Sequence, residues 1–447
     1  MDTLFSHVSV VTMDERMSVW PDAFVGVTDG KISWLSKKAP EEKPAQIING
    51  EGLLLMPGLI NGHTHLAMNL LRGWADDLPL RDWLEYRIFP REEKLDARAV
   101  KAAVTLAVAE AVRFGTTSVS DMYRFTDETA AVLAESGLKA NLCCGPVWFE
   151  NPEEDFDFER DLACQELVSL VEKWHGYDQG RIKIDASIHA EYTSAHQFWE
   201  ATARFAQEKG LRMQLHLSQT QAEEDACAER YGLSQTQTLD CHHIFDVPAT
   251  AAHCVHLSAE DMRLLGRRKA SAVHCPVSNL KLVSGCADVA GMVKAGMNVC
   301  LGTDSAASNN SLDLFEEMKA AALLARTRAQ DPAALPVEAA LMMATVCGAK
   351  AQGREAECGM IKPGMDADLI LLDLSQPHMI PCHNILSNLV YAANGRDVLM
   401  TMVRGKILYF AGKYPTLDVD GALRELRDYA IPTVFAEDRK HAEEAAQ

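Results

Sequence analysis

The chain has 447 residues, of which 48% are hydrophobic and 24% are charged, as in an ordinary soluble globular protein. This length exceeds the usual size of one domain, so we expect one large domain and a smaller one. The formal net charge of −20 argues against nucleic acid and against an anionic membrane as partners, because both bind basic patches.

The first ten residues contain no basic segment followed by an apolar core, so they do not resemble a signal peptide. No apolar run approaches the roughly 20 residues that a membrane span needs. The twelve cysteines are dispersed, which predicts buried or free thiols in a reducing compartment. We therefore expect a cytoplasmic protein.

Both ends of the chain are rich in strand patterns. Near the N-terminus the predicted strands are 5–13, 23–27 and 31–35; near the C-terminus they are 369–373 and a hairpin over 398–410. Together these ends predict a small β-sandwich built from residues 1–56 and 359–430. Residues 431–447 are charged and Ala-rich at their end, and we expect a tail there.

Strand-like and helix-like runs alternate in the middle of the chain. After a strand near His63, the predicted strands are 117–121, 140–146, 182–189, 212–217, 249–253, 272–275 and 298–304. The predicted helices are 99–114, 127–136, 161–174, 194–209, 221–231 and 259–268. About eight strands that alternate with helices predict a parallel (β/α)8 TIM-like barrel over residues 57–358.

Two histidines follow an apolar run and a Pro57-Gly58 break. On a strand, residues two apart point to the same face, so His63 and His65 would project together. Two imidazoles placed in this way can hold one metal ion, with later strands completing the site.

Further polar residues lie at the ends of the later predicted strands: His189, His216, His253, His274 and Asp304. The carboxyl ends of barrel strands meet at one rim, so these residues would converge there. Burying many imidazoles without partners costs free energy, which favours a functional site. Histidine, carboxylate and water ligands suit Zn²⁺, with Fe²⁺ and Mn²⁺ as alternatives.

Three stretches resemble the amidohydrolase superfamily: 57–65 (PGLINGHTH), 251–257 (AAHCVHL) and 301–310 (LGTDSAASNN). Within it the chain is most similar to 5'-methylthioadenosine/S-adenosylhomocysteine deaminases. The resemblance implies a metal-dependent hydrolytic deaminase of a purine nucleoside or related N-heterocycle, with one metal ion per subunit. The implied ligands are His63, His65, His216 and Asp304, and the implied catalytic groups are His253 and Asp304.

The resemblance also implies contacts to a small-molecule substrate from Trp83, Glu92, His189, Ser308 and Arg160. A carboxylate at Glu92 suits a vicinal diol, because it can accept both O–H donors. Where the family often has an arginine for an amino-acid group, this chain has Cys144, which argues against S-adenosylhomocysteine. Relatives are often oligomeric, so we expect a homo-oligomer.

The chain departs from the family at Gln219, where relatives have a proton-shuttling glutamate. A glutamine cannot deliver a proton at neutral pH, and such general acid–base help is typically worth about 10²–10⁴-fold. Three interpretations follow: another acid serves an adenosine-type substrate, the substrate is an oxidised purine or pterin, or the leaving group is a halide, as in triazine chlorohydrolases. Glu223 or Glu224 could substitute, although we expect both at the surface. A relative that has lost catalysis and serves as a binding protein is the remaining alternative.

Overall fold

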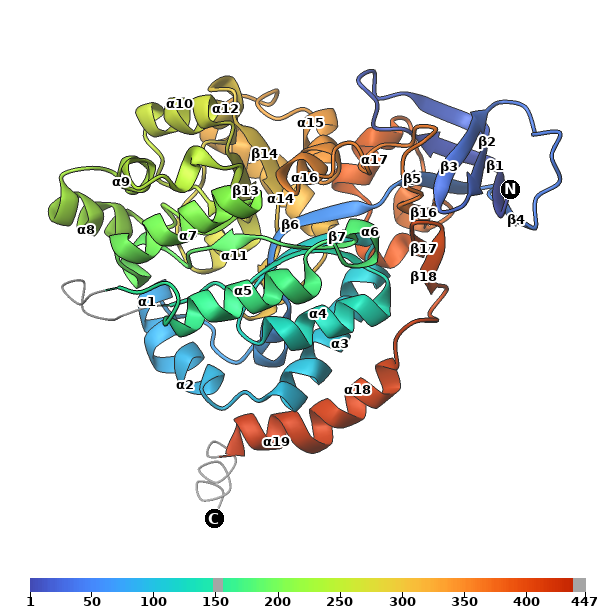
Figure 1. Ribbon diagram of the computed structural model, residues 1–447. Coiled ribbons are helices and arrows are strands. Elements are labelled where there is room, and N and C mark those ends of the chain that lie inside the picture. The colour runs from blue at the N-terminus through green and yellow to red at the C-terminus, as the bar shows by residue number, and fades with distance from the viewer. Residues whose placement is uncertain (148–155, 437–447) are drawn as a thin grey trace, which may run out of the picture.

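The computed structural model of the chain describes residues 1–147 and 156–436 (Figure 1). Two groups of parallel strands form its centre. One has the order β15-β6-β7-β8-β9 and the other β10-β11-β12-β13-β14. The strands are β6 (Leu59–His65), β7 (Thr116–Met122), β8 (Lys139–Cys143), β9 (Ile182–Ile184), β10 (Ala186–Ser187), β11 (Met213–Leu217), β12 (Ala249–His253), β13 (Ser271–His274), β14 (Asn298–Leu301) and β15 (Asp304–Ser305).

The chain passes between the two groups at two short junctions. At the first, Asp185 N donates to Leu142 O beside β8, and Ala186 N donates to Arg212 O before β11. At the second, Gly302 N donates to His274 O on β13, and Asp304 pairs with Thr64 on β6. The predicted strands 182–189 and 298–304 are therefore each divided, because the backbone changes its hydrogen-bonding partner within them.

Helices surround these strands (Figure 1). Six of them agree with the predicted helices to within about two residues: α3 (Ala97–Arg113), α4 (Thr126–Ser136), α5 (Leu162–Trp174), α7 (His196–Lys209), α8 (Gln221–Tyr231) and α10 (Ala259–Arg268). The others between β6 and β16 are η1 (Leu66–Leu71), α1 (Leu80–Trp83), η2 (Leu84–Ile88), α2 (Phe89–Glu92), α6 (Tyr177–Gly180), η3 (Glu191–Thr193), α9 (Gln235–Cys241), η4 (Ile244–Asp246), α11 (Pro276–Lys281), α12 (Val289–Lys294), α13 (Ala306–Asn309), α14 (Leu314–Ala329), α15 (Val337–Met343) and α16 (Val346–Ala351).

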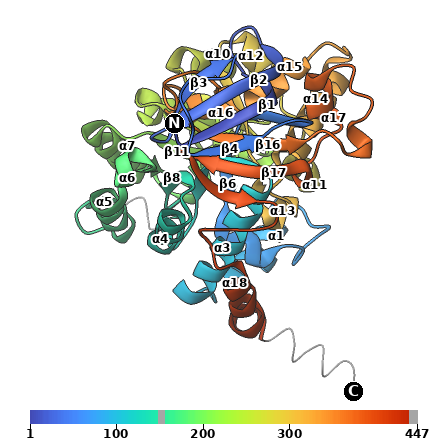
Figure 2. The ribbon, with the colours of Figure 1, turned by 90° about the vertical axis from the view of Figure 1, so that its right-hand side faces the viewer.

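Strands from both ends of the chain form one mixed sheet, which faces the viewer in Figure 2. Its order is β18-β17-β16-β5-β1-β2-β3, with β4 also paired to β1. The strands are β1 (Thr3–Val11), β2 (Val19–Thr28), β3 (Lys31–Ser36), β4 (Gln46–Asn49), β5 (Leu53–Pro57), β16 (Leu369–Asp373), β17 (Val398–Val403) and β18 (Lys406–Phe410). β5 and β16 pair antiparallel, with Leu371 opposite Leu55, and these two residues belong to an apolar core shared by the two ends of the chain.

Further short helices follow β16: η5 (Pro377–Met379), α17 (Ile385–Tyr391), η6 (Gly395–Asp397), α18 (Val419–Glu425), η7 (Leu426–Ala430) and α19 (Ile431–Val434). Arg98 on α3 forms an ion pair of 2.7 Å with Glu425 on α18. Val434 is buried, so 431–434 is packed helix and the predicted tail boundary at 431 lies too early. Residues 437–447 lie outside the described part of the chain.

All twelve cysteines are free thiols in the described residues, as the sequence indicates. Among the described helices, none is both long enough and apolar enough to cross a membrane.

Candidate active site

Three of the four predicted metal ligands come from the neighbouring strands β6 and β15. Asp304 pairs with Thr64, and Ser305 pairs with His65, so the carboxylate of Asp304 lies beside the two histidines of β6. Gly302 makes this approach possible, because a Cβ there would lie only 2.8 Å from His63 O and 2.9 Å from His63 N. Any side chain at this position would push the Asp304 segment away from β6.

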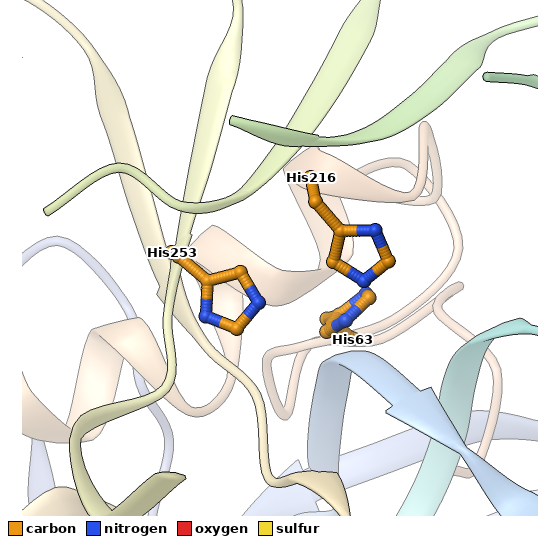
Figure 3. Close-up of side chains that lie close together, drawn as sticks. All are labelled: His63, His216 and His253. Atoms are coloured by element: carbon orange, nitrogen blue, oxygen red, sulfur yellow. The ribbon is translucent and has the colours of Figure 1, made fainter. Parts of the chain in front are cut away.

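The ligand atoms form two overlapping clusters, one of His63, His65 and Asp304 and one of His63, His216 and His253. Asp304 Oδ1 lies 3.2 Å from His65 Nε2 and 3.7 Å from His63 Nε2. His216 Nε2 lies 3.3 Å from His65 Nε2. The spacings of 3.2 and 3.3 Å suit neighbouring ligands of one metal ion, whose bonds to nitrogen and oxygen are about 2.0–2.2 Å long. Figure 3 shows the rings of His63 and His216 pointing toward one another, with His253 beside them.

Hydrogen bonds on the outer ring nitrogens fix how two of these histidines face the site. His65 Nδ1 contacts the carbonyl oxygen of Met122, and His216 Nδ1 lies 2.8 Å from His189 O. A carbonyl only accepts, so both Nδ1 atoms carry the proton, and in neutral rings both Nε2 atoms present lone pairs. Two lone pairs 3.3 Å apart repel unless a cation lies between them. The buried His63 Nε2 also has no hydrogen-bond partner among the described residues. The donor set therefore fits a metal ion.

The second oxygen of Asp304 is held by two hydroxyl groups. Ser278 Oγ donates to Asp304 Oδ2 at 2.5 Å, and Ser308 Oγ donates to it at 3.0 Å. Ser308 is 1% exposed and is not among the residues that line the cleft described below. The hydroxyl of Ser308 therefore lies against the Asp304 carboxylate, which it orients, and not in the cleft where a substrate contact was predicted.

His253 is the last residue of β12 and lies in a cluster with His63 and His216. Its ring centroid is 5.7 Å from that of His63, and its Nδ1 donates to Asn279 Oδ1 on α11 at 2.9 Å. The inward Nε2 is therefore free to accept a proton. The backbone of His253 has a φ of 73° and that of Asp304 a φ of 57°. Such left-handed conformations cost about 1–3 kcal/mol in non-glycine residues and are found at functional sites.

A cleft opens beside these residues. Besides His65, His216, His253 and Asp304, four predicted site residues line it: Trp83, Glu92, His189 and Gln219. Tyr123 OH donates to Glu92 Oε1 at 2.7 Å, and burial raises the pKa of Glu92. Burial lowers the pKa of His189 to about 4, so this ring is neutral near pH 7. The cleft therefore presents the neutral ring of His189 and the carboxylate of Glu92 beside the predicted metal ligands.

Three further residues considered in the sequence analysis do not line the cleft: Arg160, Cys144 and His274. The side chain of Arg160 is 88% exposed and pairs with Asp157 at 3.2 Å, so the structure does not support its predicted substrate contact. Cys144 is 5% exposed, and burial raises the pKa of its thiol to about 12. His274 is 1% exposed and does not line the cleft, unlike the other strand-end histidines His189, His216 and His253.

The helix that follows Gln219 carries two glutamates that the sequence analysis expects at the surface. Glu223 and Glu224 are both half-buried. Glu223 Oε2 accepts from Gln219 N at 3.1 Å, as part of the N-terminal cap of α8, and Glu224 Oε1 accepts from Ser218 Oγ at 2.5 Å. Burial raises the pKa of Glu223 to about 7, although the backbone hydrogen bonds from Thr220 and Gln219 oppose this shift.

The raised pKa of Glu223 predicts that the folded chain loses stability as the pH rises toward 7. The folded chain holds this proton up to about pH 7, whereas the unfolded chain releases it near the ordinary value of 4.5, so rising pH between these values costs stability. Glu223→Gln removes the proton and keeps an acceptor for the cap. We expect the free energy of unfolding of this variant to exceed that of wild type by a margin that grows by about 1–2 kcal/mol from pH 5 to pH 8. This range already allows for partial solvent screening. Urea denaturation at both pH values measures it. The exposed Glu229→Gln on the same helix is the control, and an equal change in both variants would contradict the burial argument.

Sequence reasoning missed Ser278, Asn279 and Tyr123. Ser278 and Asn279 lie on α11, directly after the strand that ends at His274, and Tyr123 follows the end of β7. Because the active site of such folds is built from the loops after the strands, extending the search a few residues past each strand end could have found them.

Comparisons with known proteins agree with this geometry. Residues 54–408 match the model of the amidohydrolase family. The chain belongs to the amidohydrolase family. One relative, a 5'-deoxyadenosine deaminase of Methanosarcina mazei, is 43% identical over 96% of this chain and 98% of its own length. A 5-methylthioadenosine/S-adenosylhomocysteine deaminase of Moorella thermoacetica is 41% identical over 84% of this chain and 86% of its own length.

Solved structures show the same fold. An adenosine deaminase from Xanthomonas campestris with bound zinc superposes with a TM-score of 0.90, at 33% identity, over 97% of this chain and 98% of that one. The atrazine chlorohydrolase TrzN from Arthrobacter aurescens gives 0.87 at 21% identity, over 95% of this chain and 99% of that one, which is a likeness of fold alone.

Proposed function

We propose that this amidohydrolase is a metal-dependent hydrolytic deaminase of adenosine-type nucleosides, which replaces the ring amine with oxygen and releases ammonia. The observation that carries the proposal is the close approach of His63, His65, His216 and Asp304 to one another beside a cleft. Relatives about 40% identical over most of the chain are named for deamination of this substrate class, which supports it further.

The four ligands would hold one divalent cation per subunit, and we propose zinc, with iron or manganese as alternatives. When bound, such an ion lowers the pKa of a coordinated water to about 7, which supplies a nucleophile at neutral pH. Ser278 and Ser308 hold Asp304 Oδ2, so that Oδ1 stays directed at the ligand cluster. The carbonyl oxygens of Met122 and His189 keep two imidazoles in the tautomer that a ligand needs.

His253 is the proposed general base. Asn279 accepts its Nδ1 proton, which leaves Nε2 to take a proton from the attacking water or to stabilise the developing tetrahedral centre. Asp304 is the second proton acceptor. Neither group needs to move, because both are buried and held by hydrogen bonds.

The rest of the cleft would bind the nucleoside. Glu92 Oε1 is occupied by Tyr123 OH, so the other carboxylate oxygen is available for the hydroxyl groups of a ribose. Trp83 supplies an apolar wall, and the neutral His189 lies where it can contact the base. These contacts would orient the ring carbon that carries the amine toward the ligand cluster.

Gln219 lines the cleft at the position where relatives have a proton-shuttling glutamate. Gln219→Glu should therefore raise kcat on adenosine analogues by about tenfold or more, the low side of what general acid–base help supplies. Steady-state kinetics on adenosine measures this. An unchanged or lower kcat would mean that the native proton path avoids this position, with His253 or a water chain serving instead.

An ammonia-release assay across adenosine, 5'-methylthioadenosine, 8-oxoguanine and a chlorotriazine tests the proposed function. We expect ammonia from the two nucleosides. Release from 8-oxoguanine alone would favour the oxidised purine or pterin alternative, in which the Gln219 carbonyl accepts a ring N–H. Chloride from the triazine alone would favour the chlorohydrolase alternative. No release of ammonia or chloride from any of the four compounds, by protein that holds one metal ion per chain, would favour a binding protein that has lost catalysis.

We also propose that the two groups of parallel strands close into one (β/α)8 barrel over residues 57–358, with a β-sandwich from 1–56 and 359–430. The hydrogen bonds that change partner at Asp185 and Gly302 support closure. We further propose a cytoplasmic homo-oligomer.

A further inference from the structure

The C-terminal helical run α18-η7-α19 takes no part in the chemistry proposed above, yet it packs beside a segment that forms one wall of the cleft. Figure 1 shows α18 and α19 along the lower edge of the molecule, below α3. The guanidinium of Arg98 on α3 lies 3.9 Å from the ring centroid of Tyr429 and pairs with Glu425 at 2.7 Å. Tyr429 OH also donates to Asp96 Oδ2. These contacts attach the run to the start of α3, directly after the wall segment 74–92.

Phe435, the residue after α19, contacts the wall segment itself. Its ring centroid lies 4.7 Å from that of Trp74. The guanidinium of Arg91 lies 4.8 Å from the ring centroid of Trp74 and 5.8 Å from that of Phe435. A cation thus lies against two aromatic rings that also contact each other, and both kinds of contact are favourable in water. We call Trp74, Arg91 and Phe435 the C-terminal clamp.

The two clamp residues on the wall segment each adjoin a contact of the cleft. Arg91 directly precedes Glu92, which lines the cleft. Trp74 directly precedes Ala75, whose carbonyl oxygen accepts from Nε1 of Trp83 at 3.0 Å, and Trp83 also lines the cleft. The clamp therefore holds the backbone on which both of these cleft residues depend.

The wall segment has few buried side chains of its own to fix it. The helices α1, η2 and α2 have four, five and four residues, and only two side chains in the run 80–92 are buried. Short helices with little burial are marginally stable, so their position depends on contacts from other elements. Tyr123 OH holds the carboxylate of Glu92 at 2.7 Å, and the clamp holds the neighbouring Arg91.

We propose that the C-terminal clamp positions Glu92 for the hydroxyl groups of the ribose, which makes Phe435 a positioning residue for substrate specificity. This inference rests on the proposed function, in which the Glu92 carboxylate accepts from those hydroxyl groups. Phe435 does not line the cleft, so it acts through Trp74 and Arg91. Loss of its ring should therefore weaken recognition of the hydroxyl groups more than it weakens recognition of the base.

The test compares adenosine with 2',3'-dideoxyadenosine, which lacks both hydroxyl groups, on the metal-loaded enzyme. In wild type we expect kcat/KM for adenosine to exceed that for the dideoxy compound by about tenfold or more, because hydrogen bonds to a carboxylate are lost. Phe435→Ala should lower this ratio by about fivefold or more, because the carboxylate is no longer held in place. A general loss of structure would lower kcat/KM for both substrates alike, and an unchanged ratio would overturn the proposal.

Two matched variants separate the ring of Phe435 from the packing of the C-terminal run as a whole. Phe435→Tyr keeps an aromatic ring and should keep the wild-type ratio. Leu423→Ala also removes an apolar side chain from this run, but Leu423 is 49% exposed, so the ratio should again stay as in wild type. A ratio that falls as far in either of these variants as in Phe435→Ala would overturn the role of the clamp.

Product binding separates failure of the clamp from failure of the proposed function. Calorimetry with inosine and 2',3'-dideoxyinosine on the metal-loaded protein needs no turnover. Tighter binding of inosine in wild type, with a preference that Phe435→Ala reduces and Phe435→Tyr keeps, would support the clamp even if adenosine were not deaminated. Equal binding of the two products in wild type, or a preference that Phe435→Ala leaves unchanged, would overturn the clamp even if adenosine were deaminated.

Discussion

His216→Ala should abolish both metal binding and activity. His216 Nε2 lies 3.3 Å from His65 Nε2, and both rings present lone pairs to the same point. The substitution removes a coordinating nitrogen from the cluster and leaves a space that water can fill. We expect metal content, measured by elemental analysis after gel filtration, to fall well below one equivalent per chain, and ammonia release to become undetectable.

His243→Ala is the control for this variant. His243 is an exposed histidine that pairs with Asp246 at 2.8 Å, far along the chain from the ligand cluster. Its replacement should leave metal content and turnover as in wild type. Full metal occupancy in His216→Ala would refute its ligand role, whatever the activity.

His253→Gln should lower kcat by about 10²–10⁴-fold while the metal stays bound. The imidazole is buried, its Nδ1 proton is donated to Asn279, and its inward nitrogen lies beside the ligands. Glutamine fills similar space and can still form hydrogen bonds, but it cannot accept a proton at neutral pH. Because the lost interaction belongs to the proton transfer, KM should change much less than kcat.

His256→Gln provides a matched comparison three residues further along. His256 Nε2 lies 2.7 Å from the carbonyl oxygen of Ser284, and His256 does not line the cleft. A loss of activity in this variant as large as in His253→Gln would indicate a structural effect of the loop. Near-normal kcat in His253→Gln would remove His253 from the chemistry.

The sequence was sufficient for the parts of this fold with strong local signals. β12 and α8 begin and end at the predicted residues, since apolar strand patterns and a Thr220 cap define them locally. The four ligands were implied by the resemblance to the amidohydrolase superfamily, whereas the polar residues near the predicted strand ends indicated a wider group that also includes His189, His253 and His274. The breaks at Asp185 and Gly302 could not, because they depend on which neighbouring strand the backbone meets.

The substrate side of the site was harder to predict. Ser308 hydrogen-bonds to Asp304 and Arg160 is exposed on the surface, and neither position follows from local pattern. Glu223 is half-buried rather than exposed, because its carboxylate caps the start of α8 and accepts from Gln219 N. Asn279 and Tyr123 act only through contacts with His253 and Glu92, which lie far away in sequence. Such pairings are set by packing, and the residue types alone carry no signal for them.

The central claim is that His63, His65, His216 and Asp304 hold one catalytic metal ion. X-ray absorption on the purified protein, at the edge of the metal found in it, tests this most directly. We predict one metal per chain with only nitrogen and oxygen neighbours, at about 2.0–2.2 Å for zinc. Sulfur neighbours at about 2.3 Å, which one of the twelve cysteines would give, or protein that deaminates adenosine without bound metal, would contradict the account.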